Sequence, residues 1–358
     1  MLTDAVRLFR GGAPRARALR SLPGVRWVER NHVFRASGPA FRPPNDPLYR
    51  RQWSLRGPLG LAAPGAWWVA TGGAVTVAVL DSGVRAAHPD LARNLWTNRG
   101  EVPDNGIDDD GNGFFDDVHG ADVVDGDGDP RDGLGHGTAV AGVIGARGGN
   151  ARGIAGVAWR VRLLPVRVLD DHGVGSTLTL LEGLRYAVAA GARIVNMSVN
   201  GPDRSRALEE AVAEAARQGV TIVTSAGNDG TDRDVLPSYP ASIDSDALLT
   251  VAASDASGFL AHGSAYGAVS VDLSAPGENV LTTVPGGRYG LYSGTSFAAA
   301  HVTGALALLA AARPDADAPT LRAALLAGAR RGTPLADQVV AGELNAGRAM
   351  RALVPRRG

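Results

Sequence analysis

Cysteine and lysine are both absent from this chain of 358 residues. Without cysteine the chain has no disulfide bond, no catalytic thiol and no thiolate metal site. Without lysine it cannot use a serine–lysine dyad, and all 36 basic side chains are arginine. Net charge is also lacking, because 36 acidic side chains balance the 36 basic ones. This balance argues against a nucleic-acid partner and against membrane binding through basic residues.

The sequence also lacks clear membrane and export segments. The apolar stretch 297–312 is shorter than a membrane span needs and is interrupted by His301 and Thr303, so we expect a core helix there. Residues 1–20 are rich in arginine and lack the apolar segment of a signal peptide. Composition therefore predicts no membrane partner, and the chain is expected to be a monomer.

Three short segments each place one polar group beside glycine residues. They are Val79-Leu-Asp-Ser-Gly83, Gly135-His-Gly-Thr138 and Ser293-Gly-Thr-Ser296. A serine becomes a good nucleophile when an imidazole takes its proton, and a carboxylate must orient that imidazole. The residues Asp81, His136 and Ser296 supply these three groups in the order acid, base and nucleophile. Each of them taken alone would more often be a solvated residue or a helix cap.

An asparagine adds a fourth group to this set. The segment 221–228 reads as a buried strand that ends in Gly227 and Asn228. Acyl transfer needs hydrogen-bond donors for the developing oxyanion, and an asparagine amide supplies one. The backbone N–H of Ser296, at the start of a predicted helix, supplies a second. On its own, Asn228 would be read as a turn residue before Asp229-Gly230.

These segments resemble the subtilase family of subtilisin-like serine peptidases, and the resemblance extends from Asn45 to about Met350. It implies a serine endopeptidase that forms an acyl-enzyme on Ser296. In this reading Asp81 orients His136, His136 acts as base and then as acid, and Asn228 donates to the oxyanion. The resemblance implies protein or peptide substrates and no cofactor for catalysis. Because family members are mostly exported, it also implies an extracellular location.

The resemblance further implies a substrate cleft. The strand that pairs with an extended substrate corresponds to Gly173, Val174 and Gly175. One wall of the specificity pocket corresponds to Ser198, Val199 and Asn200, and the opposite wall to Ala226 and Gly227. Asn200 stands where the family usually has glycine, so its side chain is expected to narrow the pocket. No acidic side chain occurs in the wall segments, which predicts an apolar pocket for the residue before the cut.

Alternating β-rich and helical stretches predict one α/β domain with a doubly wound, mostly parallel sheet flanked by helices. The expected strands are 74–80, 161–168, 193–199, 220–225 and 248–252, and the expected helices are 137–146, 177–190, 204–218, 296–312 and 318–329. In such a sheet, ligands bind beyond the carboxyl ends of the strands. The catalytic domain is expected to cover residues 45–358.

Residues 1–44 are expected to form a separate, propeptide-like segment and linker. Residues 21–35 resemble the last strand of an inhibitory subtilase propeptide, and 35–47 contain the proline and glycine of a linker. The segment is too short for a complete propeptide, so either the chain begins downstream of its true start or the propeptide is reduced. The alternative is an ordinary amphipathic extension. As a partner, we expect the catalytic domain's own propeptide.

An acidic loop suggests a structural calcium ion. Residues 108–116 match the first half of an EF-hand-like loop, with oxygen ligands expected from Asp108, Asp110, Asn112 and Asp116 and from the Phe114 carbonyl. The terminal glutamate of that motif is absent, so Asp116 or Asp117 would have to replace it. The alternating acids Asp125, Asp127 and Asp129 form a weaker second candidate. A solvated acidic loop is the alternative for both.

Two other functions remain open at this point. A catalytically silent or self-blocked subtilase scaffold could act as a binding module, although such a role does not require all four catalytic groups. An esterase could use the same triad, because esters are easier acyl donors than amides. Comparing turnover of matched ester and peptide substrates separates the esterase from the endopeptidase.

Overall fold

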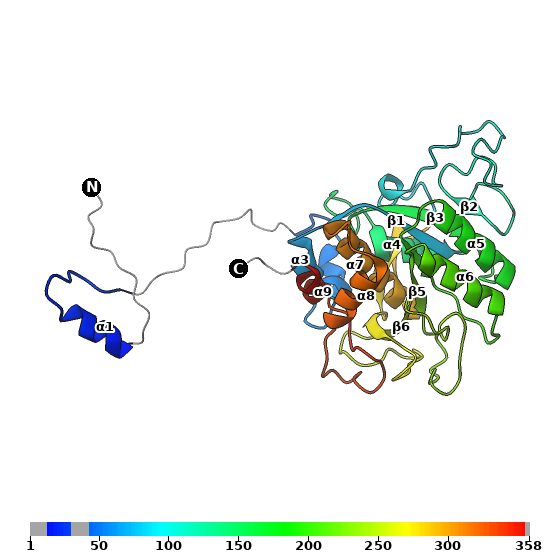
Figure 1. The fold of residues 1–358 in the computed structure, drawn as a ribbon. Helices are drawn as coiled ribbons and strands as arrows, with labels where there is room; N and C mark the ends of the chain where they lie inside the picture. The colour runs from blue at the N-terminus through cyan, green and yellow to red at the C-terminus, as the bar shows by residue number, and fades with distance from the viewer. Residues whose placement is uncertain (1–12, 30–42, 355–358) are drawn as a thin grey trace. The chain divides into compact units, whose positions relative to one another are not determined.

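The computed structural model describes residues 13–29 and 43–354 of the chain (Figure 1). The chain divides into two units, Met1–Arg42 and Pro43–Gly358. In the first unit, α1 spans Ala13–Arg20, and the described residues after it, 21–29, form no strand. The remainder of the strand predicted over 21–35 lies outside the described residues.

The second unit is built on a seven-stranded parallel sheet. Its strands are β1 (Gly72–Asp81), β2 (Ala121–Asp122), β3 (Arg160–Arg167), β4 (Ile194–Met197), β5 (Thr221–Ser225), β6 (Leu248–Ser254) and β7 (Leu273–Pro276), in the spatial order β2-β3-β1-β4-β5-β6-β7. An antiparallel pair, β8 (Val280–Val284) and β9 (Arg288–Tyr292), lies outside this sheet. The α/β class with a doubly wound parallel sheet is therefore confirmed.

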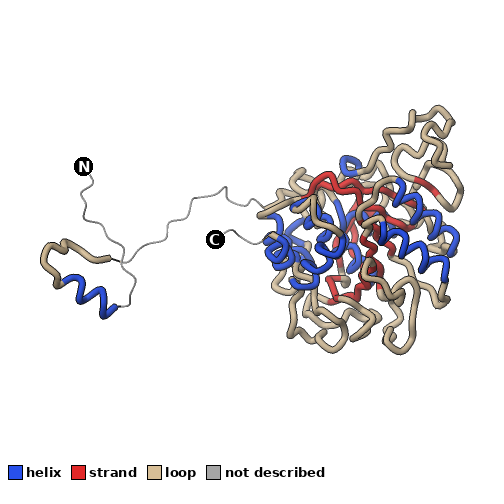
Figure 2. The backbone as a smooth tube through the Cα atoms, in the orientation of Figure 1, coloured by secondary structure: helices blue, strands red, loops and turns tan. Residues whose placement is uncertain are grey.

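Helices cover the sheet on both sides (Figure 2). The helices of this unit are α2 (Trp53–Arg56), α3 (Ala63–Trp67), α4 (His136–Gly145), α5 (Thr177–Ala189), α6 (Arg206–Arg217), α7 (Thr295–Ala312), α8 (Ala318–Ala327) and α9 (Ala346–Leu353), with short 3-10 helices at Tyr49–Arg51 and Ala92–Asn94, and α4 to α7 contact the sheet. The helices α5 and α6 pack side by side, while α4 and α7 contact each other and β1. All ten predicted strands and helices end within two residues of their observed bounds.

The two helix layers differ in composition because they differ in burial. Helix α6 is amphipathic and buries Leu208, Val212 and Ala215 against the core while its charged face is solvated. Helix α7 is apolar on all sides and, at 18 residues, is long enough to cross a membrane, so the length argument drawn from residues 297–312 does not hold; its burial inside the domain is what makes it a core helix. It is thus the core helix that the sequence predicts.

The sheet reverses its winding at β1, which pairs with β3 on one side and with β4 on the other. Such a reversal creates a crevice at the carboxyl ends of the strands, where α/β proteins bind ligands. Two glycines allow a close approach here. Gly83 has a φ of +97°, and a Cβ atom at Gly137 would lie 2.1 Å from the Gly83 carbonyl oxygen. The start of α4 therefore lies against the end of β1.

Candidate active site

Asp81 and His136 meet at this edge of the sheet. Asp81 is the last residue of β1 and is fully buried, while His136 is the first residue of α4. The His136 ring donates a hydrogen bond from Nδ1 to Asp81 Oδ1 over 2.7 Å. This contact leaves Nε2 of His136 as the nitrogen that can accept a proton. The geometry is that of a carboxylate that fixes the tautomer and orientation of a general base.

The surroundings of His136 favour its charged form. Burial alone would lower the pKa of His136, but the charge and hydrogen bond of Asp81 and the charge of Asp132 outweigh that effect and raise it. The raised pKa means that these carboxylates stabilise the imidazolium, which is the form that His136 takes when it acts as a general base and accepts a proton.

Ser296 lies in the first turn of α7 and is buried. The ring of its neighbour Phe297 lies 5.7 Å from the His136 ring, which brings the start of α7 beside the imidazole. Ser198 reaches the same turn, because its hydroxyl group donates to the Ser296 carbonyl oxygen over 3.4 Å. The N–H groups of a first helical turn have no partner within the helix, so that of Ser296 is available to an anion.

Asn228 follows β5 and is held against the same turn. Its Oδ1 accepts hydrogen bonds from the backbone N–H and from the hydroxyl group of Thr295, both over 2.9 Å. Its Nδ2 makes no hydrogen bond with any residue in the described ranges, and Asn228 lines a pocket of about 190 Å³ with Ser293 and Gly294. The Asn228 amide nitrogen is therefore free to donate, and its side chain is held by Thr295, the residue directly before Ser296.

Sequence reasoning missed a second buried carboxylate behind the Asp81–His136 pair. Asp132 is fully buried and accepts hydrogen bonds from the Ser82 hydroxyl (2.9 Å), from the Gly135 N–H (2.6 Å) and from the Thr138 N–H (2.8 Å). The Ser82 N–H donates to Asp81 Oδ1 over 2.8 Å. Asp132 lies four residues before His136, and only its burial distinguishes it from the many solvated aspartates in the sequence.

The segments predicted to bind substrate have unpaired backbone groups. Within the described part of the chain, the Gly173 carbonyl and the Gly175 N–H have no hydrogen-bond partner, and neither do the backbone N–H and carbonyl groups of Asn200. A Cβ atom at Gly173 would lie 3.2 Å from Leu134 Cδ2, which places this segment beside the loop before His136. Such open backbone edges can pair with an extended peptide.

Asn200 connects the two segments predicted to form the pocket walls. Its Nδ2 donates to the Ser225 carbonyl oxygen, and the Ser225 hydroxyl donates to Asn200 Oδ1, each over 2.9 Å. On the first side, Ser198 is buried and Val199 is half-buried, and on the second side Ala226 and Gly227 are buried. The Asn200 side chain therefore bridges the two segments.

The acidic loop brings together a different set of carboxylates from the one predicted. The Asp108 carboxylate accepts hydrogen bonds from the backbone N–H groups of residues 111–113, over 2.8 to 3.0 Å. The Asp116 carboxylate accepts from the N–H groups of Asn105 and Gly106. The Asn112 side chain donates to Asp117 Oδ2 over 2.9 Å.

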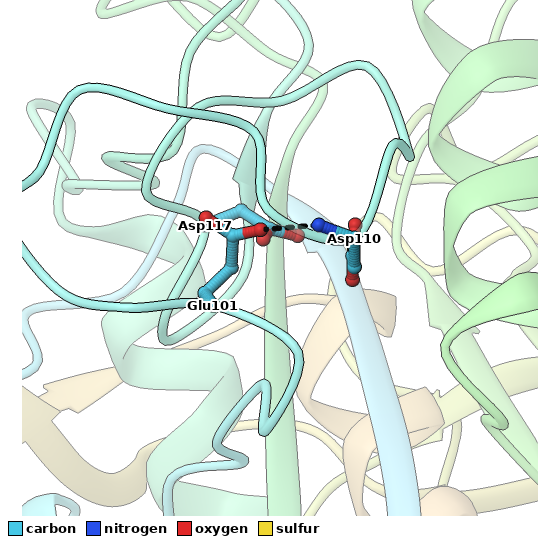
Figure 3. A group of neighbouring side chains, drawn as sticks. All are labelled: Glu101, Asp110 and Asp117. Atoms are coloured by element: carbon cyan, nitrogen blue, oxygen red, sulfur yellow. Dashed lines mark hydrogen bonds between the residues drawn. The ribbon is translucent and has the colours of Figure 1, made fainter.

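Of the four side chains predicted as ligands, only Asp110 belongs to the group that converges, together with Asp117, which was named as a possible replacement for the terminal glutamate. One oxygen each of Glu101, Asp110 and Asp117 lie within 4.8 Å of one another (Figure 3). Glu101 and Asp117 are buried, and the Asp110 N–H donates to Glu101 Oε1 over 3.2 Å. Burial raises the pKa of Asp117, although hydrogen bonds from Tyr186, Asn98 and Asn112 oppose this rise. A cation would relieve the repulsion among these carboxylates, so this donor set fits a hard metal ion.

Comparison with known proteins identifies the class. A sequence profile described as the subtilase family matches residues 72–347. This match covers more than half of the chain, and the fold and the Asp81–His136 contact agree with it. The chain belongs to the subtilase family, and it is a serine endopeptidase.

Particular relatives support the same assignment. The chain is 37% identical over 283 residues to thermitase of Thermoactinomyces vulgaris, which covers 79% of this chain and 90% of thermitase. It is 37% identical over 257 residues to the major intracellular serine protease of Bacillus subtilis (strain 168), which covers 70% of this chain and 72% of that protease. A solved structure titled as proteases from Pseudoalteromonas arctica PAMC 21717 superposes with a TM-score of 0.73 at 30% identity, covering 87% of this chain and all of that one.

Proposed function

We propose that this endopeptidase cleaves peptide bonds through an acyl-enzyme on Ser296. His136 Nε2 removes the proton from the Ser296 hydroxyl as this oxygen attacks the substrate carbonyl carbon. Asp81 holds the imidazole in place and stabilises the imidazolium that forms. His136 then protonates the leaving amine, and a water molecule hydrolyses the acyl-enzyme by the same two proton transfers.

Asn228 Nδ2 and the Ser296 N–H stabilise the oxyanion of both tetrahedral intermediates. A donor that is already positioned needs no reorganisation when the charge develops, which is why such groups lower the barrier. The observation that carries the proposal is the fixed amide of Asn228, whose oxygen is bound by Thr295 and whose nitrogen has no hydrogen-bond partner among the described residues.

The substrate binds as an extended strand. Its backbone pairs with Gly173 and Gly175 on one side and with Ser198, Val199 and Asn200 on the other, and its side chain before the cut enters between Asn200 and Ala226–Gly227. The unpaired backbone groups of Gly173, Gly175 and Asn200 support this assignment. The side chain of Asn200 limits the depth of the pocket, which favours small apolar residues.

Matched peptide and ester substrates test this function. An endopeptidase hydrolyses internal amide bonds of a protein or peptide substrate, and the Ser296→Ala variant loses this activity. Turnover of the ester alone would assign the chain to the esterases. A folded chain that cleaves neither substrate, before and after removal of residues 1–44, would support the silent scaffold.

We further propose that Glu101, Asp110 and Asp117 bind a structural Ca²⁺ ion. The ion would hold the acidic loop to the domain, and it has no part in the proton transfers at Ser296. Metal bound only by the folded state stabilises that state by mass action.

Finally, we propose that residues 1–44 are a propeptide-like segment and that 45–358 form a monomeric catalytic domain that functions outside the cell. If the segment blocks the cleft, its removal raises activity toward a peptide substrate. Unchanged activity after removal would favour an ordinary extension. Fractionation of the producing cells tests the location, and light scattering tests the oligomeric state.

A further inference from the structure

Arg233 is a buried cation directly behind the loop that carries Asn228. Its side chain is only 3% exposed. The guanidinium donates from Nε to the Ala226 carbonyl oxygen over 2.7 Å and from Nη2 to both carboxylate oxygens of Asp229, over 2.7 and 2.8 Å. One rigid group thus contacts the residue two positions before Asn228 and the residue directly after it.

Arg233 packs tightly against the loop between these contacts. Gly227 has a φ of +114°, and a Cβ atom there would lie 2.2 Å from Arg233 Nη2, so the guanidinium packs directly on the Gly227 backbone. Arg233 Nη1 also donates to the Thr231 hydroxyl over 2.6 Å and to the Leu236 carbonyl over 3.3 Å. All three guanidinium nitrogens are therefore engaged.

The Asp229 carboxylate that faces Arg233 is ionised at neutral pH. Partial burial would raise the pKa of Asp229, but hydrogen bonds from Thr231 and Arg233 outweigh it and lower this pKa to about 2. A buried guanidinium without its partners would be strongly unfavourable, so the loop conformation that satisfies it is preferred. Lysine would not serve equally well, because its single ammonium group cannot span both ends of the loop.

We propose that Arg233 is a positioning residue for the oxyanion hole: by clamping Ala226 to Asp229, it fixes the backbone from which Asn228 reaches the reacting carbonyl. The inference rests on the proposed role of Asn228. Arg233 does not touch the substrate, and its effect reaches the reaction only through the Asn228 amide. Misplacing such a donor by a fraction of an ångström weakens the hydrogen bond most at the transition state, where the oxygen carries its full charge.

A double-mutant cycle on the full chain tests this role. We would measure kcat and KM on one peptide substrate for wild type, Arg233→Met, Asn228→Ala and the double variant. Asn228→Ala should lower kcat about a hundredfold to a thousandfold, a magnitude known from subtilisin. Arg233→Met should lower kcat about tenfold with little change in KM. In the Asn228→Ala background, the same change at Arg233 should have almost no further effect on kcat.

Two further variants separate positioning from general stability. Arg233→Lys keeps a cation for Asp229 but cannot also hold Ala226, so it should regain thermal stability more fully than kcat. Arg322→Met breaks another part-buried ion pair, the one with Asp272, in which nitrogen and oxygen lie 2.5 Å apart. Asp272 directly precedes β7 and so lies at the amino ends of the parallel strands, whereas the catalytic groups lie beyond their carboxyl ends. Arg322→Met should lower the melting temperature and leave kcat unchanged.

The inference is overturned if Arg233→Met lowers kcat by the same factor with and without Asn228, or if it changes only KM or the melting temperature. Failure of the proposed function looks different. In that case Asn228→Ala itself leaves kcat unchanged, or wild type does not hydrolyse the peptide.

Discussion

Asn200 and Ser225 hold each other through two hydrogen bonds of 2.9 Å, one to the Ser225 carbonyl oxygen and one from the Ser225 hydroxyl. Ser225 is the last residue of β5, and Asn200 lies three residues after the end of β4, the neighbouring strand in the sheet. In the proposed substrate complex this bridge lies where the side chain before the cut enters, so Asn200, which stands where the family usually has glycine, is expected to influence which side chain binds there.

Replacing Asn200 by glycine is expected to open the pocket. The ratio of kcat/KM for phenylalanine over alanine before the cut should rise about tenfold or more, because a large apolar side chain gains buried area. Ser225→Ala removes only one of the two hydrogen bonds and should change this ratio less. Peptide profiling that shows the same ratio in Asn200→Gly as in wild type would contradict the role of Asn200.

Asp132 is expected to raise the pH below which activity is lost, because its charge helps to raise the pKa of His136. His136 must be neutral to act as base, so kcat/KM falls as the pH drops through its pKa, which lies above the ordinary value of 6.5. Asp132→Asn removes one of the two negative charges that raise this pKa. The acid limb of the pH profile should therefore move to lower pH.

Asp272→Asn is the matched control for that variant, because it removes a part-buried carboxylate at the opposite edge of the sheet. Its acid limb should coincide with that of wild type. An acid limb that stays in place in Asp132→Asn, whatever the loss of activity, would reduce Asp132 to a purely structural role.

His301 makes folding sensitive to acid. Its Nδ1 donates to the Phe297 carbonyl oxygen and its Nε2 accepts from the Ser54 hydroxyl, while burial lowers its pKa to about 4. The unfolded chain binds a proton near pH 6.5, so this stability is complete above pH 6.5 and is lost as the pH falls to about 4. The fall in pKa corresponds to about 3 kcal/mol.

Urea unfolding of the Ser296→Ala protein, which avoids self-digestion, measures this effect at pH 7.5 and 4.5. Between the higher and the lower pH, the free energy of unfolding should fall more for the Ser296→Ala protein than for the protein that also carries His301→Gln. Equal falls in the two proteins would show that His301 does not titrate on unfolding.

Calcium is expected to raise the melting temperature in the same inactive background. Glu101→Gln and Asp117→Asn should each abolish the difference between excess calcium and chelator. The exposed Glu210→Gln on α6, outside both acidic segments, serves as the control and should retain this difference. A melting temperature that does not depend on calcium in the parent protein would exclude the site. If only Asp108→Asn abolished the calcium-dependent difference, the ligand set predicted from the motif would be favoured.

The sequence predicted the sheet and the main helices because local patterns determine them. The β-branched run of β1 and the capped, periodic helices α5 and α6 are visible over ten to fifteen residues. The short strands β2 and β7 and the β8–β9 hairpin were not predicted; β2 has only two residues, and β9 is only partly buried and lacks a continuous apolar run.

The interactions around the site were harder to predict because they join distant segments. Ser82 meets Asp132 across 50 residues, and nothing in either local sequence indicates the contact. The acidic motif was visible, but its first aspartate binds backbone N–H groups of its own loop. Glu101, which lies outside the motif, takes its place among the converging carboxylates.

The most direct test of the account is covalent labelling of the purified chain by a fluorophosphonate probe. Such a probe reacts with a serine only when the base and the oxyanion donors are assembled around it. We expect labelling of a single site in the catalytic domain, its loss in Ser296→Ala and a much slower rate in Asn228→Ala. Labelling that persists in Ser296→Ala, or a folded wild-type chain that does not react even without residues 1–44, would contradict it.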